Sequence, residues 1–165
     1  MTPTLRDSMN LVSDPASLDH SVHEVFETML GLECRRQSSL ESLDANRGAE
    51  SVTAVVGFGG ILSGACILCC KASAARRIAE CMAGMNFDAV DDVVKDAIGE
   101  ICNMIAGTWK GKVPELSANC GLSVPAVITG SDYKLHVQAP EFKIRHTYSF
   151  EETHFEMTIV CDGLQ

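Results

Sequence analysis

Residues 89–109 repeat their apolar side chains with the period of an α-helix. At 100° per residue, the branched aliphatic side chains fall within about 60° of one another on one side of this helix: Val94, Ile98, Ile101 and Ile105. The opposite side carries Asp96, Glu100 and Asn103, whose spacings of four and three residues make them neighbours on a helix surface. The segment therefore predicts a long amphipathic helix with one carboxamide and two carboxylates on its wet face.

Two glycines, Gly99 and Gly107, join this polar line, as do Asp92 and Lys110. An interior glycine destabilises a helix by about 1 kcal/mol relative to alanine. It also lets another surface approach the helix backbone, because it has no side chain. Periodicity alone leaves two interpretations open. The line is a docking site for another molecule, or it is a solvated face that tolerates two glycines, and periodicity slightly favours the second.

The chain before this helix reads as a helix, a short strand and a hairpin. A capping-box pattern at Ser21 predicts a first helix that ends near Gly31, followed by a strand within 32–37 and a loop over 38–50. Two β-rich runs, 51–58 and 61–70, join at Gly59-Gly60 as a hairpin. A second helix, capped by Ser73, is expected to end at Gly84.

The chain after it reads mainly as strands. Asp88 is the expected N-cap of the long helix, and a loop containing Pro114 and Gly121 follows that helix. A strand over 123–129 has Pro125 near its start, and 142–150 and 153–161 form a last hairpin. This order predicts an α+β fold of helix, β-hairpin, two helices and three or more strands, with helices packed on a mostly antiparallel sheet. We expect a flexible lead-in, residues 1–16, and a single domain, residues 17–165.

Composition excludes several classes of protein. A formal net charge of −9 argues against nucleic acid binding, which needs clustered Lys and Arg. No stretch of the chain reaches the roughly eighteen consecutive apolar residues that a membrane span needs, and the N-terminus lacks a signal-peptide pattern. A cytoplasmic location is therefore expected. The eight cysteines are then expected to be reduced thiols. Cys66, Cys69 and Cys70 come closest to a metal pattern, but no second ligand pair accompanies them, so no metal site is expected.

The helical motif and Pro125, read together, resemble the CheX/CheC/FliY family of bacterial chemotaxis phosphatases. The family signature is Asp or Ser, three residues, Glu, two residues, Asn, then some twenty-two residues and Pro. Asp96, Glu100 and Asn103 match its helical part without a gap, and Pro125 follows after twenty-one intervening residues. The first helix offers Glu24-Val-Phe-Glu27 and no second Glu-x-x-Asn, so the single-site CheX type is the closer match.

The resemblance implies a CheC-like fold that dimerises through its sheet, and a phosphatase acting on a phospho-aspartyl, CheY-like response regulator. It implies that Asn103 orients the attacking water and that Glu100 docks the lysine of the regulator. The expected partner-binding residues are Asp96, Gly99, Gly107 and Lys110. No cofactor is expected on this chain, because Mg²⁺ would be supplied by the phosphorylated regulator.

Three points stay open at this stage. The same face could belong to a non-catalytic module that binds a response regulator or a flagellar-switch component. A small-molecule sensor domain rests on the α+β architecture alone. Trp109, beside Lys110, has two equally supported interpretations: an exposed anchor for a partner, or a side chain packed beneath the following loop.

Overall fold

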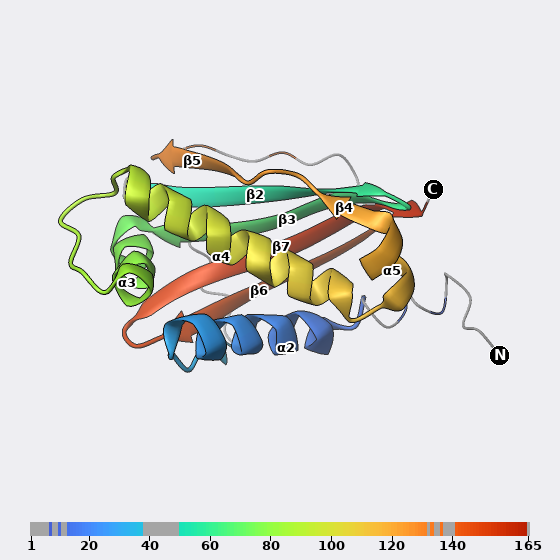
Figure 1. The fold of residues 1–165 in the computed structure, drawn as a ribbon, viewed down its shortest axis with the longest axis horizontal. Coiled ribbons are helices and arrows are strands. Elements are labelled where there is room, and N and C mark those ends of the chain that lie inside the picture. Colours follow the sequence, from blue (N-terminus) through green and yellow to red (C-terminus); the bar gives the residue numbers. More distant parts are fainter. Residues whose placement is uncertain are drawn as a thin grey trace.

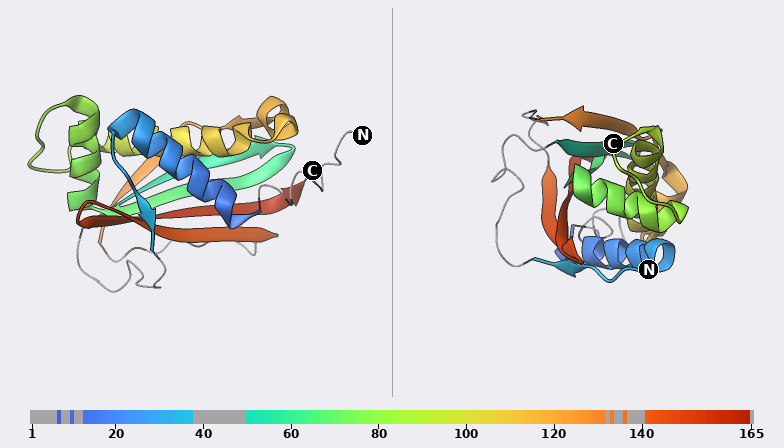
Figure 2. Two further views of the ribbon diagram at one scale, coloured as in Figure 1. Left: turned by 90° about the horizontal axis from the view of Figure 1, so that it is seen from below. Right: turned by 90° about the vertical axis from the view of Figure 1, so that its left-hand side faces the viewer.

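The protein has two layers, an antiparallel sheet and a set of helices that cover one of its faces (Figures 1 and 2). The structure is a computed structural model and describes residues 7, 10, 13–37, 50–131, 133, 136 and 141–164. The longest helix, α4 (Asp92–Gly111), crosses the sheet diagonally. The other helices are α2 (Pro15–Val25), which a π-helical turn (Phe26–Leu30) extends, α3 (Ala72–Ala83) and α5 (Pro114–Asn119).

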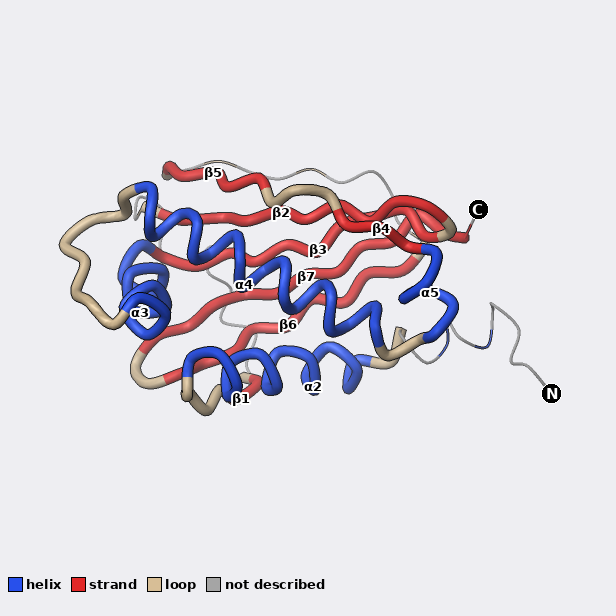
Figure 3. The backbone as a smooth tube through the Cα atoms, viewed as in Figure 1, coloured by secondary structure: helices blue, strands red, loops and turns tan. Residues whose placement is uncertain are grey.

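The described residues form a seven-stranded sheet in the order β1-β6-β7-β3-β2-β4, with β5 also paired to β2 (Figure 3). Every strand pair in it is antiparallel. The predicted α+β class, with helices on a mostly antiparallel sheet, is therefore confirmed. The strands are β1 (Arg35–Arg36), β2 (Ser51–Gly60), β3 (Leu62–Lys71), β4 (Cys120–Leu122), β5 (Ala126–Gly130), β6 (Phe142–Phe150) and β7 (Thr153–Leu164).

Both predicted hairpins are present. β2 and β3 pair from Ser51 opposite Lys71 up to Phe58 opposite Gly64. The chain turns at Ile61, one residue after the predicted glycine pair, which instead ends β2 and pairs with β4. β6 and β7 pair up to Phe150 opposite Thr153. β7 then lies beside β3, which joins the two hairpins into one sheet.

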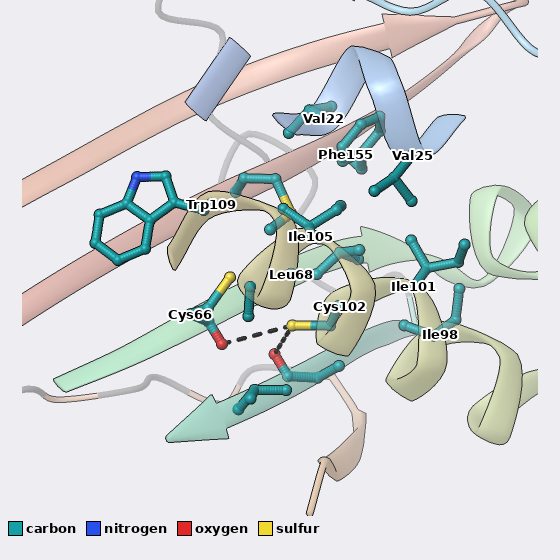
Figure 4. Packing of buried hydrophobic residues seen from close by; sticks show 14 of the residues in the cluster. Val22, Val25, Cys66, Leu68, Ile98, Ile101, Cys102, Ile105, Trp109 and Phe155 are labelled. Atoms are coloured by element: carbon teal, nitrogen blue, oxygen red, sulfur yellow. Dashed lines mark hydrogen bonds between the residues drawn. The ribbon is translucent and has the colours of Figure 1, made fainter. Parts of the chain in front are cut away.

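The apolar face of α4 is buried as its periodicity predicted. Val94, Ile98, Ile101 and Ile105 all have 0% of their surface exposed. Figure 4 shows Ile98, Ile101 and Ile105 in this packing. The thiol of Cys102 lies over the sheet, 3.7 Å from the carbonyl oxygen of Ala54 and 3.5 Å from that of Cys66. Burying one aliphatic side chain of this size contributes about 1.5–3 kcal/mol. This face therefore holds α4 rigidly on the sheet.

Trp109 belongs to the same buried face, and the interpretation as an exposed anchor is wrong. Its side chain has 0% of its surface exposed, and its ring lies 5.3 Å from the ring of Phe58. The indole Nε1 donates a hydrogen bond of 3.2 Å to Ser17 Oγ on α2. Trp109 therefore fastens α2 to the end of α4 and is unavailable to a partner.

The first helix begins earlier than predicted. Asp14 is its N-cap, with Oδ1 accepting a 3.1 Å hydrogen bond from Ala16 N, and Pro15 occupies the first turn. Ser21 is instead buried inside α2, where Oγ donates to the carbonyl oxygen of Ser17 at 2.9 Å. The helix start predicted at Ser21 is therefore wrong, because Asp14-Pro15 is as strong a helix-start signal as the capping box. The lead-in before residue 13 falls mostly outside the described residues.

Other element ends differ from prediction by a few residues. Lys71 precedes α3 without a side-chain cap, so Ser73 lies inside the helix. Asp91, not Asp88, caps α4, because its Oδ1 accepts a 3.0 Å hydrogen bond from Val94 N. The expected loop after α4 contains α5 and β4. Gly31 and Gly84 end their helices in the left-handed conformation as predicted, with φ of 65° and 69°. Most of the predicted loop over 38–50 lies outside the described residues.

The eight cysteines are free thiols, as predicted. Burial raises the pKa of Cys34 and of Cys161 to about 12, so both stay protonated at neutral pH. Most of these thiols are small core side chains. In the described part of the chain, no helix is long and apolar enough to cross a membrane.

Candidate functional site

The exposed side of α4 carries the predicted polar line. Asp96 and Glu100 are exposed, and Asn103 is half-buried. All three stand on a helix that is capped by Asp91 and fixed to the sheet by its opposite face. A rigid helix therefore presents the three side chains in a defined geometry.

These three side chains have no partner among the residues that the structure describes. Neither Asp96, Glu100 nor Asn103 makes a hydrogen bond or an ion pair there. Other polar groups of α4 do find partners, since Asp92 lies 3.7 Å from Lys95 Nζ and Lys110 Nζ donates to the carbonyl oxygen of Ser117 at 3.2 Å. The carboxylate and the carboxamide therefore keep their full hydrogen-bonding capacity for water or another molecule.

The two glycines of the line are covered by the chain itself. A Cβ added to Gly99 would lie 3.2 Å from Pro125 Cβ and 3.4 Å from Val127 Cγ2, and Gly99 is buried. A Cβ on Gly107 would lie 3.8 Å from Leu122 Cδ1. The prediction of an open glycine strip for a partner is therefore wrong at Gly99. The surface that approaches the helix backbone is the segment between β4 and β5.

We call residues 122–125 the connector. Leu122 contacts α4 at Gly107 and Pro125 contacts it at Gly99, so the connector runs along α4 in the opposite direction (Figure 1). Asn103 lies four residues from each glycine, on the same side of the helix. By this spacing the connector passes near Asn103, which is half-buried, whereas Glu100 is exposed.

Ser123 anchors the connector to the sheet. Its N–H donates to the carbonyl oxygen of Gly57 at 2.9 Å, and its Oγ accepts from Gly57 N at 2.8 Å. The next residue, Val124, is 87% exposed. Val93, in the first turn of α4, is 51% exposed and precedes Asp96 by three residues. Neither valine is among the predicted site residues. The helical period could have indicated Val93, whereas no local signal indicates the exposure of Val124.

A second polar cluster lies on the other side of α4, where α2 meets β1 and β6. Asp19 accepts a 2.6 Å hydrogen bond from Tyr148 OH, lies 3.1 Å from His146 Nδ1, and forms a 3.1 Å ion pair with Arg36. Burial, with the hydrogen bond to Asp19, raises the pKa of Tyr148. Each of these groups has a partner within the chain, so the cluster fastens three elements together and offers little to a ligand. No group of three or more His, Cys, Asp or Glu in the described residues could hold a metal ion.

Comparison with known proteins identifies sequence relatives. A family model described as chemotaxis phosphatase CheX matches residues 52–147, more than half of the chain. A protein of Thermotoga maritima named CheY-P phosphatase CheX is 28% identical over 118 residues, which cover 70% of this chain and 74% of the relative.

Solved structures share the fold. The chemotaxis protein CheX of Desulfovibrio desulfuricans aligns with a TM-score of 0.72 at 22% identity, covering 92% of this chain and 99% of that one. A CheX of Borrelia burgdorferi, crystallised in a complex described as CheX-CheY-BeF3-Mg, aligns with a TM-score of 0.72 at 20% identity, covering 88% and 96%. At these identities the likeness shows the fold alone.

Proposed function

We propose, from the premise that this chain belongs to the chemotaxis phosphatase CheX family, that it accelerates the dephosphorylation of a phosphorylated CheY-like response regulator. The observation that carries the proposal is a Glu and an Asn, one turn apart on a rigid helix, whose side chains have no partner among the described residues. The name of the Thermotoga relative and the CheY in the Borrelia complex support the choice of substrate.

Asn103 is the residue that we assign to water positioning. The substrate is an acyl phosphate on an aspartate, which is already activated, so catalysis consists mainly of placing a water in line with phosphorus. A carboxamide can accept a hydrogen bond from that water and donate one to a neighbouring oxygen. Its side chain is half-buried, which restricts its rotamers. Orientation of this kind accounts for roughly 10²-fold in rate.

Glu100 is the residue that we assign to docking. It is exposed and has no ion-pair partner among the described residues, so it can form an ion pair with the active-site lysine of the regulator. Asp96 lies one turn away and adds a second negative charge to the same surface. Lys110 remains in the proposed partner surface through its position on the helix, although its ammonium already bonds Ser117. Gly99 and Gly107 contribute by admitting the connector.

We propose that the metal ion required for the reaction comes with the regulator. The phosphorylated receiver site carries Mg²⁺, which neutralises charge on the phosphoryl oxygens. Metal analysis of the purified chain without regulator should therefore find no stoichiometric metal. A tightly bound metal in that sample would contradict this part of the proposal.

The decisive experiment follows the decay of a phosphorylated receiver domain with and without the protein. A CheY-like regulator of the same organism is phosphorylated with acetyl phosphate, the donor is removed, and phosphate release is timed. Wild type should accelerate decay, Asn103→Ala should lose roughly 10²-fold of the acceleration, and Glu100→Gln should chiefly raise KM. Asn86→Ala and Glu33→Gln are matched controls, because both residues are exposed and lie off the polar line.

A binding measurement beside the phosphate-release assay tests the second candidate, a non-catalytic binding module. Isothermal titration with the phosphorylated regulator measures binding independently of hydrolysis. Binding by wild type without faster phosphate release would favour the module. An Asn103→Ala variant as active as wild type would contradict the water-positioning role.

We also propose a homodimer. Among the described strands, β5 pairs with β2 along one edge and leaves the other edge unpaired. A free edge is a template for pairing with another strand. Light scattering on the purified protein at micromolar concentration should give the mass of two chains, and the mass of one chain would contradict the proposal.

We further propose a cytoplasmic location, because CheY-like receiver domains act as diffusible signalling proteins inside the cell. Cell fractionation followed by immunodetection tests it. Recovery in the membrane pellet at high salt would contradict it.

A further inference from the structure

Two valines next to the polar line have exposed side chains that do not pack in the core. Val124 is 87% exposed and Val93 is 51% exposed, and they are among the most exposed large apolar side chains of the described residues. Single exposed apolar residues are common on protein surfaces. These two differ because they lie on either side of the same candidate site.

The position of Val124 is set by its neighbours on both sides. Ser123 exchanges two hydrogen bonds with Gly57 of β2, and Pro125 packs against Gly99 of α4. The proline also restricts the backbone of Val124 to an extended conformation. Val124 is therefore held in place by the backbone while its side chain projects into solvent. An ordered exposed side chain costs little further entropy when a partner covers it.

Val93 lies on the same helical line as the acidic residues. It precedes Asp96 by three residues and Glu100 by seven, which places it about 10 Å from Glu100 along the helix axis. Val124 lies next to Pro125, which contacts α4 at Gly99, directly before Glu100. The two valines therefore flank the carboxylates, and the whole surface fits within the footprint of one receiver domain.

The charge of this surface decides between two possible occupants. Asp96 and Glu100 are exposed on α4 without an ion-pair partner among the described residues, whereas Asp92 lies 3.7 Å from Lys95 Nζ, and the chain as a whole carries a net charge of −9. A second copy of the chain docking here would bring like charges together. A partner with a basic group beside an apolar patch would meet both the carboxylates and the valines.

We propose that Val124 is the apolar anchor on which the phosphorylated receiver domain docks, with Val93 as a second and weaker contact beyond the carboxylates. This inference rests on the proposed function. The receiver places its lysine against Glu100 while an apolar side chain next to its phosphorylation site covers Val124. Apolar contact beside a desolvated ion pair is the usual composition of an interface hot spot.

Loss of the proposed anchor should raise KM and leave kcat nearly unchanged. Replacing Val124 with Ser removes apolar contact that exists in both the bound substrate and the transition state, so KM should rise about tenfold while kcat stays within about twofold. Val124→Ile keeps the apolar contact and should retain a KM near that of wild type. Val93→Ser should raise KM about threefold, because Val93 is less exposed and lies farther from Asn103.

Met29→Ser is the matched control. Met29 is 42% exposed and lies in the π-helical turn that extends α2. Figure 1 shows α2 and the segment between β4 and β5 on opposite sides of α4. Removing its side chain should leave both KM and kcat unchanged. Circular dichroism melting of all variants checks that each is folded, which is expected because surface substitutions usually change stability little.

The outcomes distinguish the inference from the function on which it rests. If Asn103→Ala loses activity and Val124→Ser keeps the KM of wild type, the site is correct and the anchor is wrong. If Val124→Ser lowers kcat with unchanged KM, the residue does not act by docking, and the inference is likewise overturned. If wild type does not accelerate decay at all, the proposed function itself fails. A rise in KM for Val124→Ser, restored in Val124→Ile, supports the anchor.

Discussion

The Asp19 cluster and the Asp96–Asn103 line are both polar and both include helix residues, but among the described residues only the first is satisfied by hydrogen bonds and ion pairs. Asp19 bonds Tyr148 at 2.6 Å and Arg36 at 3.1 Å, and its neighbour His146 is only 15% exposed. In the described residues, the side chains of Glu100 and Asn103 make no hydrogen bond or ion pair, although they stand on a helix whose opposite face is fully buried. A polar group that serves the fold finds its partner in the fold, because an unpaired buried group costs about 1–3 kcal/mol.

The difference also separates stability from activity. The Asp19 cluster joins α2, β1 and β6, and hydrogen bonds to charged groups of this kind contribute about 1.5–3 kcal/mol each. Removing the Asp19 cluster should destabilise the fold and leave the candidate site intact. Changing the polar side chains on α4 should lower activity and leave stability nearly unchanged. Four substitutions test this separation, from the largest expected effect to the smallest.

Asn103→Asp should have the largest effect, on activity alone. The new carboxylate has nearly the same shape, but it cannot donate a hydrogen bond and it repels the phosphoryl group. Phosphate release from the phosphorylated regulator should fall by at least ~10²-fold. The free energy of unfolding, measured with urea, should change by less than about 0.5 kcal/mol. A large loss of stability would show that Asn103 serves the fold after all.

Asp19→Ala should have the opposite effect. It removes the carboxylate that accepts from the buried hydroxyl of Tyr148 and pairs with the guanidinium of Arg36, so the free energy of unfolding should fall by about 2 kcal/mol. The kcat of the folded protein should be unchanged. In a double-mutant cycle with Tyr148→Phe, the double mutant should lose less stability than the sum of the losses of the two single mutants. Full additivity would argue against a coupled cluster.

Gly99→Ala should reduce activity moderately with little net change in stability. The added methyl gains about 1 kcal/mol of helix propensity, but it meets Pro125 Cβ at 3.2 Å and Val127 Cγ2 at 3.4 Å. The connector must then move away from Asn103, so we expect activity to fall about tenfold. Gly111→Ala is the control, because a Cβ there meets nothing within 4 Å. Equal activities would show that the connector has no role in positioning Asn103.

Trp109→Phe should have the smallest effect, again on stability. It removes the 3.2 Å hydrogen bond to Ser17 and part of the contact with Phe58. Thermal unfolding should indicate a loss of about 1 kcal/mol. Regulator binding should be unchanged, because the side chain is fully buried. Weaker binding would revive the rejected interpretation of Trp109 as an anchor.

The parts that could be predicted from the sequence are those set by local periodicity. The buried face of α4, the exposure of Asp96 and Glu100, and the two hairpins all follow from patterns within about twenty residues. The family is confirmed by the matching family model, which bears out a resemblance based on Asp96, Glu100, Asn103 and Pro125. The roles of these residues remain proposals. Helix starts were predicted less well, since Asp14 and Asp91 cap helices where Ser21 and Asp88 were expected.

Contacts between segments distant in the sequence could be found only in the folded chain. A helical wheel shows that Gly99 lies beside Asn103, but it cannot show that Pro125 covers it, since that contact depends on how β5 pairs with β2. Asp19 bonds His146 and Tyr148, which lie more than a hundred residues away on β6. The apolar face of a helix can be predicted from periodicity, because that pattern lies within a few neighbouring turns. Which polar groups are left without a partner depends on the packing of the whole chain, and that property marks the candidate site.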